Sequence, residues 1–247
     1  MNSKYKVLKY RSSNTSEIDD SISIEEPLEI TIKFKNKETW VENTISITMR
    51  TPGNDEDLVR GFLFNERIIE KIEFIDKIES AGENVGQYNL KNKIIATINN
   101  SENIDIDKIK RNFLTNSSCG VCGKTSLDSL EIIKKDKIMK SLPKIDHKII
   151  MKSPTTLREN QSEFSKTGGI HASGLFSNKG NVIAIKEDVG RHNALDKLIG
   201  YVLKNKLLNP SNQFLTCSGR LNFELVQKAL MSNIGVLIGV GAPTSLA

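Results

Sequence analysis

The sequence predicts an α/β protein, with a small α+β unit in its first part and a three-layer α/β domain in its last part. In the first third, strand-like alternation of polar and apolar residues dominates and one amphipathic helix interrupts it. From about residue 150, strand and helix patterns alternate. A length of 247 residues suits one large or two modest domains. We therefore expect an α+β domain at 1–115, a C-x-x-C loop, helix and connector at 116–150, and an α/β domain at 151–247.

The first expected elements form a β-hairpin. Residues 19–34 alternate polar and apolar side chains, and the apolar ones fall on one face, which is typical of a strand. A turn follows at 36–39, and 41–49 return as a second strand.

An amphipathic helix is expected after this hairpin. Asn54 or Asp55 can cap a helix over about 55–66, with an apolar side made by residues such as Leu58. Glu66 ends that helix, and we expect its carboxylate to be solvated. The remaining elements expected before residue 115 are two or three strands within 70–100 with a turn at 82–86, and a short helix over 103–113.

The C-terminal part alternates strands and helices after a lysine-rich connector that reaches residue 152. Ser153-Pro154 matches the cap-then-proline pattern that begins helices, and Asn178 to Asn181 match a hairpin turn. The expected helices cover 153–166, 193–205 and 221–232, and the expected strands cover 172–177, 181–186, 213–217 and 234–240.

Composition excludes several classes of protein. The net charge is +5, but 27 lysines and eight arginines are spread without a block of five like charges, so a nucleic-acid stripe is not expected. The N-terminus lacks an apolar signal core, and the longest apolar run, 234–242, is too short to span a bilayer. Three cysteines, an odd number, fit a reducing compartment. We expect a soluble cytoplasmic protein without membrane or nucleic-acid partners.

The most informative motif is Cys119-Gly120-Val121-Cys122, because it places two of three cysteines three residues apart. Such thiols serve as a redox dithiol, half of a zinc site or a persulfide carrier. The preceding residues 116–118 are polar, whereas a redox dithiol usually follows a core strand, so thioredoxin-like use is disfavoured. Zinc would need two further ligands, which only Cys217 and three histidines could supply without a second paired motif. A zinc-binding role for the cysteine pair therefore stays open, but a persulfide-carrier role is favoured over it.

The surroundings of this pair favour a reactive thiol on a mobile loop. The flanking glycines loosen the backbone. Thr125 or Ser126 can cap a helix over about 126–135, and its positive N-terminus would act with Lys124 to favour thiolate at either cysteine. A nucleophilic sulfur of this kind suits a group carrier.

Polar and glycine residues gather at three corners where an expected strand leads into a helix. Ligands of open α/β sheets bind at such points. Each corner offers backbone N–H groups and two add an arginine, which suits a phosphate-bearing ligand, although helix capping explains any single corner. The corners are Gly190-Arg191-His192-Asn193, Ser218-Gly219-Arg220 and Gly241-Ala242-Pro243-Thr244-Ser245.

Two histidines near these corners have open roles. His171 and His192 could each have only a structural role, in which the ring donates a hydrogen bond to a loop carbonyl. With Asp188 and Asp196 as orienting carboxylates, they could instead support the site or bind a nucleobase, and spacing does not decide between these roles.

Together these motifs resemble the formate dehydrogenase accessory sulfurtransferase family, the FdhD family, from about residue 18 to the end. Any one motif is weak, and their joint order makes the resemblance specific. The residues that carry it are Glu25-Glu26-Pro27-Leu28, Arg50-Thr51-Pro52-Gly53, Leu58, Gly61-Phe62-Leu63, Cys119 to Gly123, Thr167-Gly168-Gly169-Ile170-His171-Ala172, Glu187 to Ala194, Asp196-Lys197, Ser218-Gly219-Arg220 and Ala242 to Ala247.

The resemblance implies a cytoplasmic homodimer that takes sulfur from a cysteine desulfurase and passes it to the molybdenum or tungsten cofactor of formate dehydrogenase. It implies Cys119 as the persulfide-bearing residue and Cys122 as its helper. The acceptor would be Mo-bis(molybdopterin guanine dinucleotide), which a GDP-like nucleotide should mimic. The residues expected to bind it are Gly169, His171, Arg191, His192, Asn193, Ser218, Gly219, Arg220, Pro243 and Thr244.

The resemblance also implies a C-terminal domain with a cytidine-deaminase-like fold, but without a metal. Zinc deaminases carry H-x-E and P-C-x-x-C. Here Ser173 follows His171-Ala172, and Ser218-Gly219-Arg220 stands where a cysteine pair would be.

Two departures and one alternative accompany the resemblance. Arg67 stands where a glycine is expected. The chain ends at Ala247, just as Pro243 opens what would be another helix, so we expect part of the cofactor site to be missing. The alternative is a non-catalytic chaperone that binds the molybdenum cofactor, its cysteines only gripping the metal or the dehydrogenase.

Overall fold

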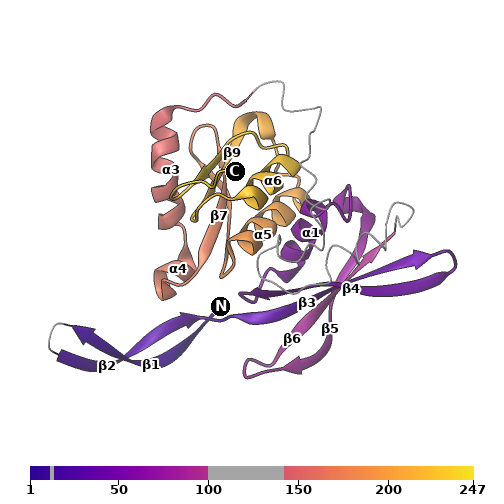
Figure 1. Ribbon diagram of the computed structural model, residues 1–247, viewed down its shortest axis with the longest axis horizontal. Coiled ribbons are helices and arrows are strands. Elements are labelled where there is room, and N and C mark those ends of the chain that lie inside the picture. The colour runs from indigo at the N-terminus through magenta and orange to yellow at the C-terminus, as the bar shows by residue number, and fades with distance from the viewer. Residues whose placement is uncertain (12–13, 100–141) are drawn as a thin grey trace.

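The computed structural model describes residues 1–11, 14–99 and 142–247. Their strands form a two-stranded ribbon and two four-stranded sheets (Figure 1). A mixed α/β fold with several sheets is therefore confirmed. The Cys119–Cys122 loop and the helices expected over 103–113 and 126–135 lie outside the described residues.

The N-terminal sheet has the strand order β4-β3-β6-β5. Its strands are β3 (Glu26–Asn36), β4 (Thr39–Arg50), β5 (Ile75–Val85) and β6 (Leu90–Ile98). β3 and β4 form the expected hairpin, whose turn places Lys37 at a φ of 55°. The turn between β5 and β6 was wrongly predicted at 82–86. It lies at Gly86, which accepts a hydrogen bond from Asn89, while Gly82 falls in β5 where the pairing is irregular.

Helix α1 (Asp55–Asn65) packs its apolar side on this sheet, as the periodicity predicted. Asn54 is the N-cap residue, but its backbone is left-handed and its side chain makes no cap hydrogen bond. Three carboxylates occupy the first turn, where the positive end of the helix dipole stabilises them. A short 3₁₀ turn, Ile72–Phe74, precedes β5.

The backbone conformation at Arg67 explains why a glycine is expected at this position after α1. The backbone N–H of Ile68 donates to Leu63 O and that of Arg67 donates to Phe64 O, which is the Schellman arrangement. Arg67 therefore holds a φ of 58°, a left-handed conformation that a Cβ disfavours.

We expect Arg67→Gly to raise the free energy of unfolding by about 1 kcal/mol, because glycine adopts this conformation without the steric penalty. Arg67→Ala is the matched control, since it removes the same side chain and keeps the Cβ. Urea denaturation of both variants makes the comparison, and equal stability would contradict this explanation.

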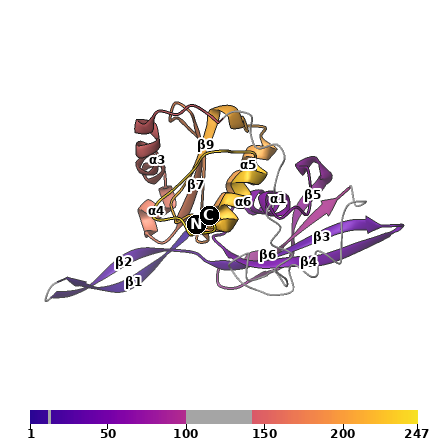
Figure 2. The same ribbon diagram turned by 45° about the horizontal axis from the view of Figure 1, so that its top comes forward.

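A ribbon at the N-terminus was not predicted as such. The alternating residues 19–34 divide at Ile24 and Glu25, so that β2 (Asn14–Ser23) pairs with β1 (Asn2–Arg11) instead of continuing into β3. The ribbon extends away from the body in both views (Figures 1 and 2). Its base is held by Glu163, which accepts a hydrogen bond from Asn2 and lies 3.1 Å from the N-terminal amine of Met1.

The C-terminal sheet lies between helices on its two faces, which gives the expected three layers. The strand order is β10-β9-β7-β8, with β10 parallel to β9 and the other neighbours antiparallel. One core cluster joins the sheet to α5 and α6, and a second, with Phe176 and Phe214, joins it to α3 (Figure 1). The elements are α3 (His147–Glu159), α4 (Ser162–Thr167), β7 (His171–Ser177), β8 (Val182–Asp188), α5 (Arg191–Lys204), β9 (Gln213–Cys217), α6 (Phe223–Met231) and β10 (Leu237–Gly239), with a 3₁₀ turn at Pro210–Asn212.

The helix expected over 153–166 was placed wrongly. α3 begins at His147, because Asp146 caps it by accepting from the backbone N–H of Lys148. Pro154 is therefore inside the helix and leaves the carbonyl of Ile150 without its helical donor. The hydroxyl of Ser153 donates to that carbonyl at 2.9 Å, which compensates for the missing N–H. α4 is a separate helix, and the strand expected over 234–240 is shorter than predicted.

The two parts meet where α1 crosses α5 at two glycines. A Cβ on Gly61 would lie 1.9 Å from the carbonyl oxygen of Asp196, and one on Gly200 would lie 1.9 Å from that of Asp57. Such distances exclude any side chain larger than hydrogen, so the helix backbones are in direct contact. This contact fixes the C-terminal sheet relative to the N-terminal one.

Buried ion pairs also cross this junction. Lys228 on α6 donates to both carboxylate oxygens of Asp196 at 2.8 and 2.9 Å, and Asn65 donates to the same carboxylate. Glu66 lies 3.3 Å from the Lys228 ammonium and is mostly buried, so its expected solvated role was wrong. The apolar periodicity of the sequence could not predict this partner of Glu66, because Lys228 lies 162 residues further along the chain.

Candidate functional site

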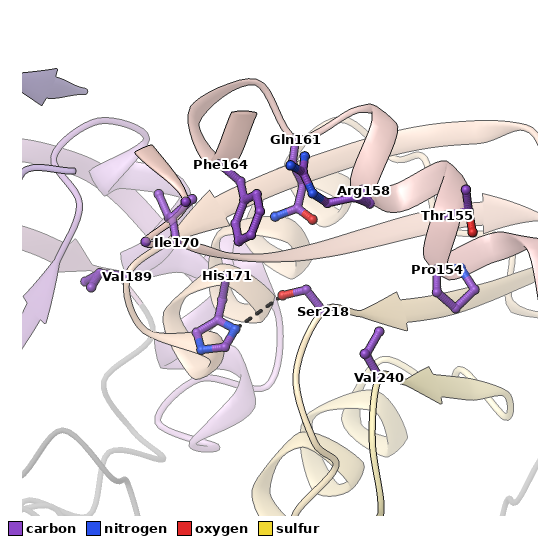
Figure 3. Close-up of a pocket in the computed structure, with 12 residues that line it drawn as sticks. Pro154, Thr155, Arg158, Gln161, Phe164, Ile170, His171, Val189, Ser218 and Val240 are labelled. Carbon is purple, nitrogen blue, oxygen red and sulfur yellow. Dashed lines mark hydrogen bonds between the residues drawn. The ribbon is translucent and has the colours of Figure 1, made fainter. Parts of the chain in front are cut away.

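The site begins where β7 and β9 lie side by side. The backbone N–H of Ala172 donates to the Ser218 hydroxyl at 2.9 Å, and the backbone N–H of Ser218 donates to Ala172 O at 2.9 Å. The ring nitrogen Nδ1 of His171 lies 3.3 Å from the same hydroxyl (Figure 3). Ser218 therefore fixes the start of β7 and the orientation of the His171 ring.

Gly219 brings a second charged residue to this point. A Cβ on Gly219 would lie 3.5 Å from the His171 ring and 3.5 Å from Cδ of Arg191, so both side chains border it. Arg191 is the first residue of the 14-residue helix α5, whose N-terminus favours anions. Thus four of the residues predicted to bind nucleotide lie together: His171 at the start of β7, Arg191 at one corner, and Ser218 and Gly219 at another.

Electrostatics at this point favours a negatively charged ligand. Burial lowers the pKa of His171, and the neighbouring Arg191 and His192 side chains lower it further, against a smaller opposing effect of Asp188. His171 is therefore neutral at pH 7, and Arg191 supplies the local positive charge. An approaching phosphate would meet the arginine and the helix N-terminus together.

Asp188 holds the backbone at the start of α5 in place by hydrogen bonds. Its carboxylate is fully buried and accepts hydrogen bonds from the backbone N–H of Gly190 at 2.8 Å and of Thr51 at 3.1 Å. Lys197 lies 2.7 Å from this carboxylate and also donates to Thr51 O. Burial raises the pKa of Asp188, and Lys197 with these N–H donors opposes that rise. The first turn of α5 is thereby anchored to the N-terminal part.

Two predicted nucleotide-binding residues, Asn193 and His192, make hydrogen bonds or ion-pair contacts with neighbouring elements. Asn193 donates to Met49 O at 2.8 Å and to Thr48 Oγ1 at 3.1 Å, which ties α5 to β4. His192 is buried, and its Nε2 lies 3.0 Å from the Glu224 carboxylate on α6. The partners of His192 are therefore side chains of α6 and of the residue that caps it, not the loop carbonyl considered from the sequence.

The third corner lies in the C-terminal tail. Pro243 and Thr244 are exposed, and the backbone N–H of Thr244 donates to Leu221 O at 3.0 Å. Arg220 is also exposed, and its side chain passes beside Gly241. The tail and the second corner therefore lie together at the surface.

A cavity of about 620 Å³ opens beside His171 and Ser218 (Figure 3). Predicted residue Gly169 lines it, but three of its polar and aromatic residues were missed: Arg158, Gln161 and Phe164. The sequence predicted only a helix over 153–166, and it carried no signal that residues of this segment would face the β7–β9 corner. The other lining residues are Pro154, Thr155, Gly168, Ile170, Val189 and Val240.

Cys217 is the only cysteine among the described residues. It is buried, and burial raises its pKa to about 11. A thiol with this pKa stays protonated near neutral pH and is a poor nucleophile. Within the same part of the chain, no three histidine, cysteine or carboxylate side chains converge to hold a metal ion.

Comparison with known proteins decides the family. The family model described as FdhD/NarQ matches residues 23–247. The chain belongs to the FdhD/NarQ family. The resemblance found from the motifs is therefore confirmed.

Named relatives of this FdhD/NarQ chain match along most of its length. It is 43% identical over 231 residues to the sulfur carrier protein FdhD of Picrophilus torridus, which covers 93% of this chain and 82% of that protein. It is 38% identical over 245 residues to the sulfur carrier protein FdhD of Sulfurisphaera tokodaii, which covers 99% of this chain and 87% of that protein.

A solved structure supports the fold of this FdhD/NarQ chain. The crystal structure of a protein from Desulfotalea psychrophila, described as a formate dehydrogenase accessory protein, aligns with a TM-score of 0.66 at 22% identity. The alignment covers 99% of this chain and 86% of that one. Separately, no helix within 1–11, 14–99 and 142–247 combines the length and apolar character needed to cross a bilayer.

Proposed function

We propose that this chain is a sulfur carrier that takes persulfide sulfur from a cysteine desulfurase and transfers it to a molybdenum cofactor bearing guanine dinucleotides, for use by formate dehydrogenase. The observation that carries this proposal is membership of the FdhD/NarQ family, with relatives named sulfur carrier protein over more than 90% of the chain. The proposal places this exchange in the cytoplasm, where thiols stay reduced, and in a homodimer.

The sulfur is carried on Cys119, with Cys122 as its helper. The Cys119 thiolate attacks the outer sulfur of the donor's persulfide. A new S–S bond forms on Cys119 while the donor's S–S bond breaks, and the donor leaves as a cysteine thiolate. The protonated, buried state of Cys217 supports assigning this role to the other two cysteines.

The acceptor cofactor is the substrate of the second step, and its nucleotide ends bind in the C-terminal part. Arg191 and the N-terminus of α5 suit a phosphate, and the adjoining cavity of about 620 Å³ has room for a nucleobase. Helices on both faces of the C-terminal sheet support the proposed likeness to cytidine deaminases, with Ser173 in place of the glutamate of H-x-E and Ser218-Gly219-Arg220 in place of the cysteine pair.

Mass spectrometry tests the loading step. The protein is incubated with a cysteine desulfurase and cysteine and then digested. We expect mass increments of one sulfur atom on the peptide that contains Cys119 and Cys122, and none on the peptide that contains Cys217. If the unmutated protein gains no sulfur on the first peptide, the carrier function is wrong.

The alternative function, a non-catalytic chaperone for the cofactor, is distinguished from a carrier by measuring nucleotide binding and formate dehydrogenase activity with Cys119→Ala. A chaperone would bind guanine nucleotides and restore formate dehydrogenase activity after Cys119→Ala. A carrier would keep nucleotide binding and lose the restored activity.

A further inference from the structure

The ribbon of β1 and β2 is a projecting arm that the body of the described chain does not cover. Its two ten-residue strands pair along their whole length, yet neither contributes a side chain to the three core clusters of the described residues. A two-stranded ribbon by itself is at best marginally stable in water. In Figures 1 and 2 the outer part of the ribbon lies away from the other described elements, so we expect a partner surface on it.

The body holds the root of the ribbon and leaves its outer half free. At the root, the hydroxyls of Ser23 and of Thr167 on α4 share a hydrogen bond of 2.7 Å, in addition to the contacts of Glu163. Further out, Leu8 and Tyr10 are 65% and 76% exposed. The arm is therefore fixed in direction before it meets a partner, which lowers the entropy lost on binding.

One face of the ribbon carries basic side chains on β1 beside acidic side chains on β2. Residues directly opposite each other in an antiparallel pair share a face, as do residues two apart along a strand. The pairs on this face are Lys4–Ser21, Lys6–Asp19, Leu8–Glu17 and Tyr10–Thr15. Lys6 lies 3.4 Å from Glu17, but both side chains are more than half exposed, so this ion pair is weak and its charges remain accessible to another molecule.

The partner that suits this face is a second copy of the chain. β1 carries four basic and no acidic residues, and β2 carries three acidic and no basic residues. The acidic strand would repel a nucleic acid or an anionic membrane. An identical ribbon laid on this face by a twofold axis along the ribbon places β1 of each copy on β2 of the other, so both contacts join opposite charges.

We propose that the β1–β2 ribbons of two copies pack face to face in this way and form the interface of a homodimer. This inference rests on the homodimer of the proposed function and assigns its interface. Because the axis runs along the ribbon, Lys6 lies over Asp19 of the partner subunit, and the exposed Leu8 and Tyr10 become buried between the ribbons. Each ribbon supplies ten residues from each of its two strands, which approaches the roughly 20–30 residues per partner of a standard interface.

Light scattering of the full-length chain over a range of concentrations tests this interface. The unmutated protein should have a mass of about twice 27.6 kDa. Lys4→Glu combined with Lys6→Glu makes both strands of the face acidic, and Glu17→Lys combined with Asp19→Lys makes both strands basic. Each double variant should dissociate, with a dimer Kd raised by at least about tenfold, because like charges then face each other. An equimolar mixture of the two double variants joins opposite charges again and should recover the dimer.

The matched control makes the same change of charge on the other face of β1. Lys9→Glu combined with Arg11→Glu should keep the dimer Kd within about threefold. The inference is wrong if both double variants of the first face keep the Kd of the unmutated protein, or if both dissociate and their mixture stays monomeric. The second result would place each ribbon on another part of the partner copy. A monomeric unmutated protein would overturn both this interface and the proposed homodimer, while persulfide loading tests the carrier function separately.

Discussion

Lys197→Met should lower the free energy of unfolding by about 3–5 kcal/mol, because it leaves Asp188 as a buried carboxylate without its cation. The carboxylate has no exposure, and the Lys197 ammonium lies 2.7 Å from it. The substitution also removes the donor to Thr51 O, which links α5 to the end of β4. Urea denaturation of the unmutated protein and the variant measures the difference.

The pH dependence of this effect identifies its cause. Burial already raises the pKa of Asp188, and without Lys197 the folded-state pKa should rise further. A carboxyl with a raised folded-state pKa lowers the free energy of unfolding little at low pH, where the carboxyl is protonated in both the folded and the unfolded state. The cost grows as the pH rises from the unfolded-state pKa to the folded-state pKa, and it is constant above the folded-state pKa. The loss of stability in Lys197→Met should therefore be smaller at pH 5 than at pH 8.

Two comparisons check this prediction. Lys204→Met makes the same change in α5 at a half-exposed lysine 3.9 Å from Glu56, and it should change stability by no more than about 0.5 kcal/mol. Adding Asp188→Asn to Lys197→Met removes the unpaired charge and should recover part of the loss. A loss that is equal for Lys197→Met and Lys204→Met, or that does not vary with pH, would contradict the buried-pair explanation.

Cys119→Ala should abolish the restoration of formate dehydrogenase activity in cells that lack this protein, because the proposed persulfide then has no sulfur to form on. Cys122→Ala should reduce activity less, since the helper thiol does not carry the sulfur itself. The measurement is formate dehydrogenase activity in extracts of complemented cells, with protein levels checked in parallel.

Cys217→Ala is the matched control for this pair of variants. Its thiol is buried in the C-terminal sheet and shares a hydrogen bond with the Ser173 hydroxyl, so it is not available as a carrier of sulfur. It should keep the restored activity as long as the protein accumulates. Full activity in Cys119→Ala would remove the carrier function and leave the chaperone.

Local patterns predicted much of the fold. The hairpin of β7 and β8 and the helix α5 were expected because their apolar spacing and turn residues agree with one another. α3 was placed wrongly because Ser153-Pro154 imitates a helix start, whereas Ser153 in fact compensates for Pro154 inside the helix. The crossing of α1 and α5 depends on Gly61 and Gly200, which are 139 positions apart and carry no local pattern.

The candidate site was only partly predictable for the same reason. Glycine and arginine at strand ends indicated Arg191 and Gly219, because strand-to-helix corners meet at one edge of a sheet. Gln161 is the residue that precedes α4 and Phe164 lies in α4, and only the packing of α3 and α4 on the sheet brings them to this corner. Asn193 matched the motif, and its side chain donates to Met49 O on β4 and to Asp188 on β8.

The most direct test of the sulfur-carrier proposal follows a labelled sulfur atom from donor to acceptor. The protein is loaded from isotopically labelled cysteine by a cysteine desulfurase, separated from the donor, and mixed with the molybdenum cofactor. The proposal predicts that label leaves the peptide of Cys119 and Cys122 and is recovered in the cofactor, and that Cys119→Ala acquires none. Label that never enters this peptide, or that remains there when the cofactor is added, would contradict it.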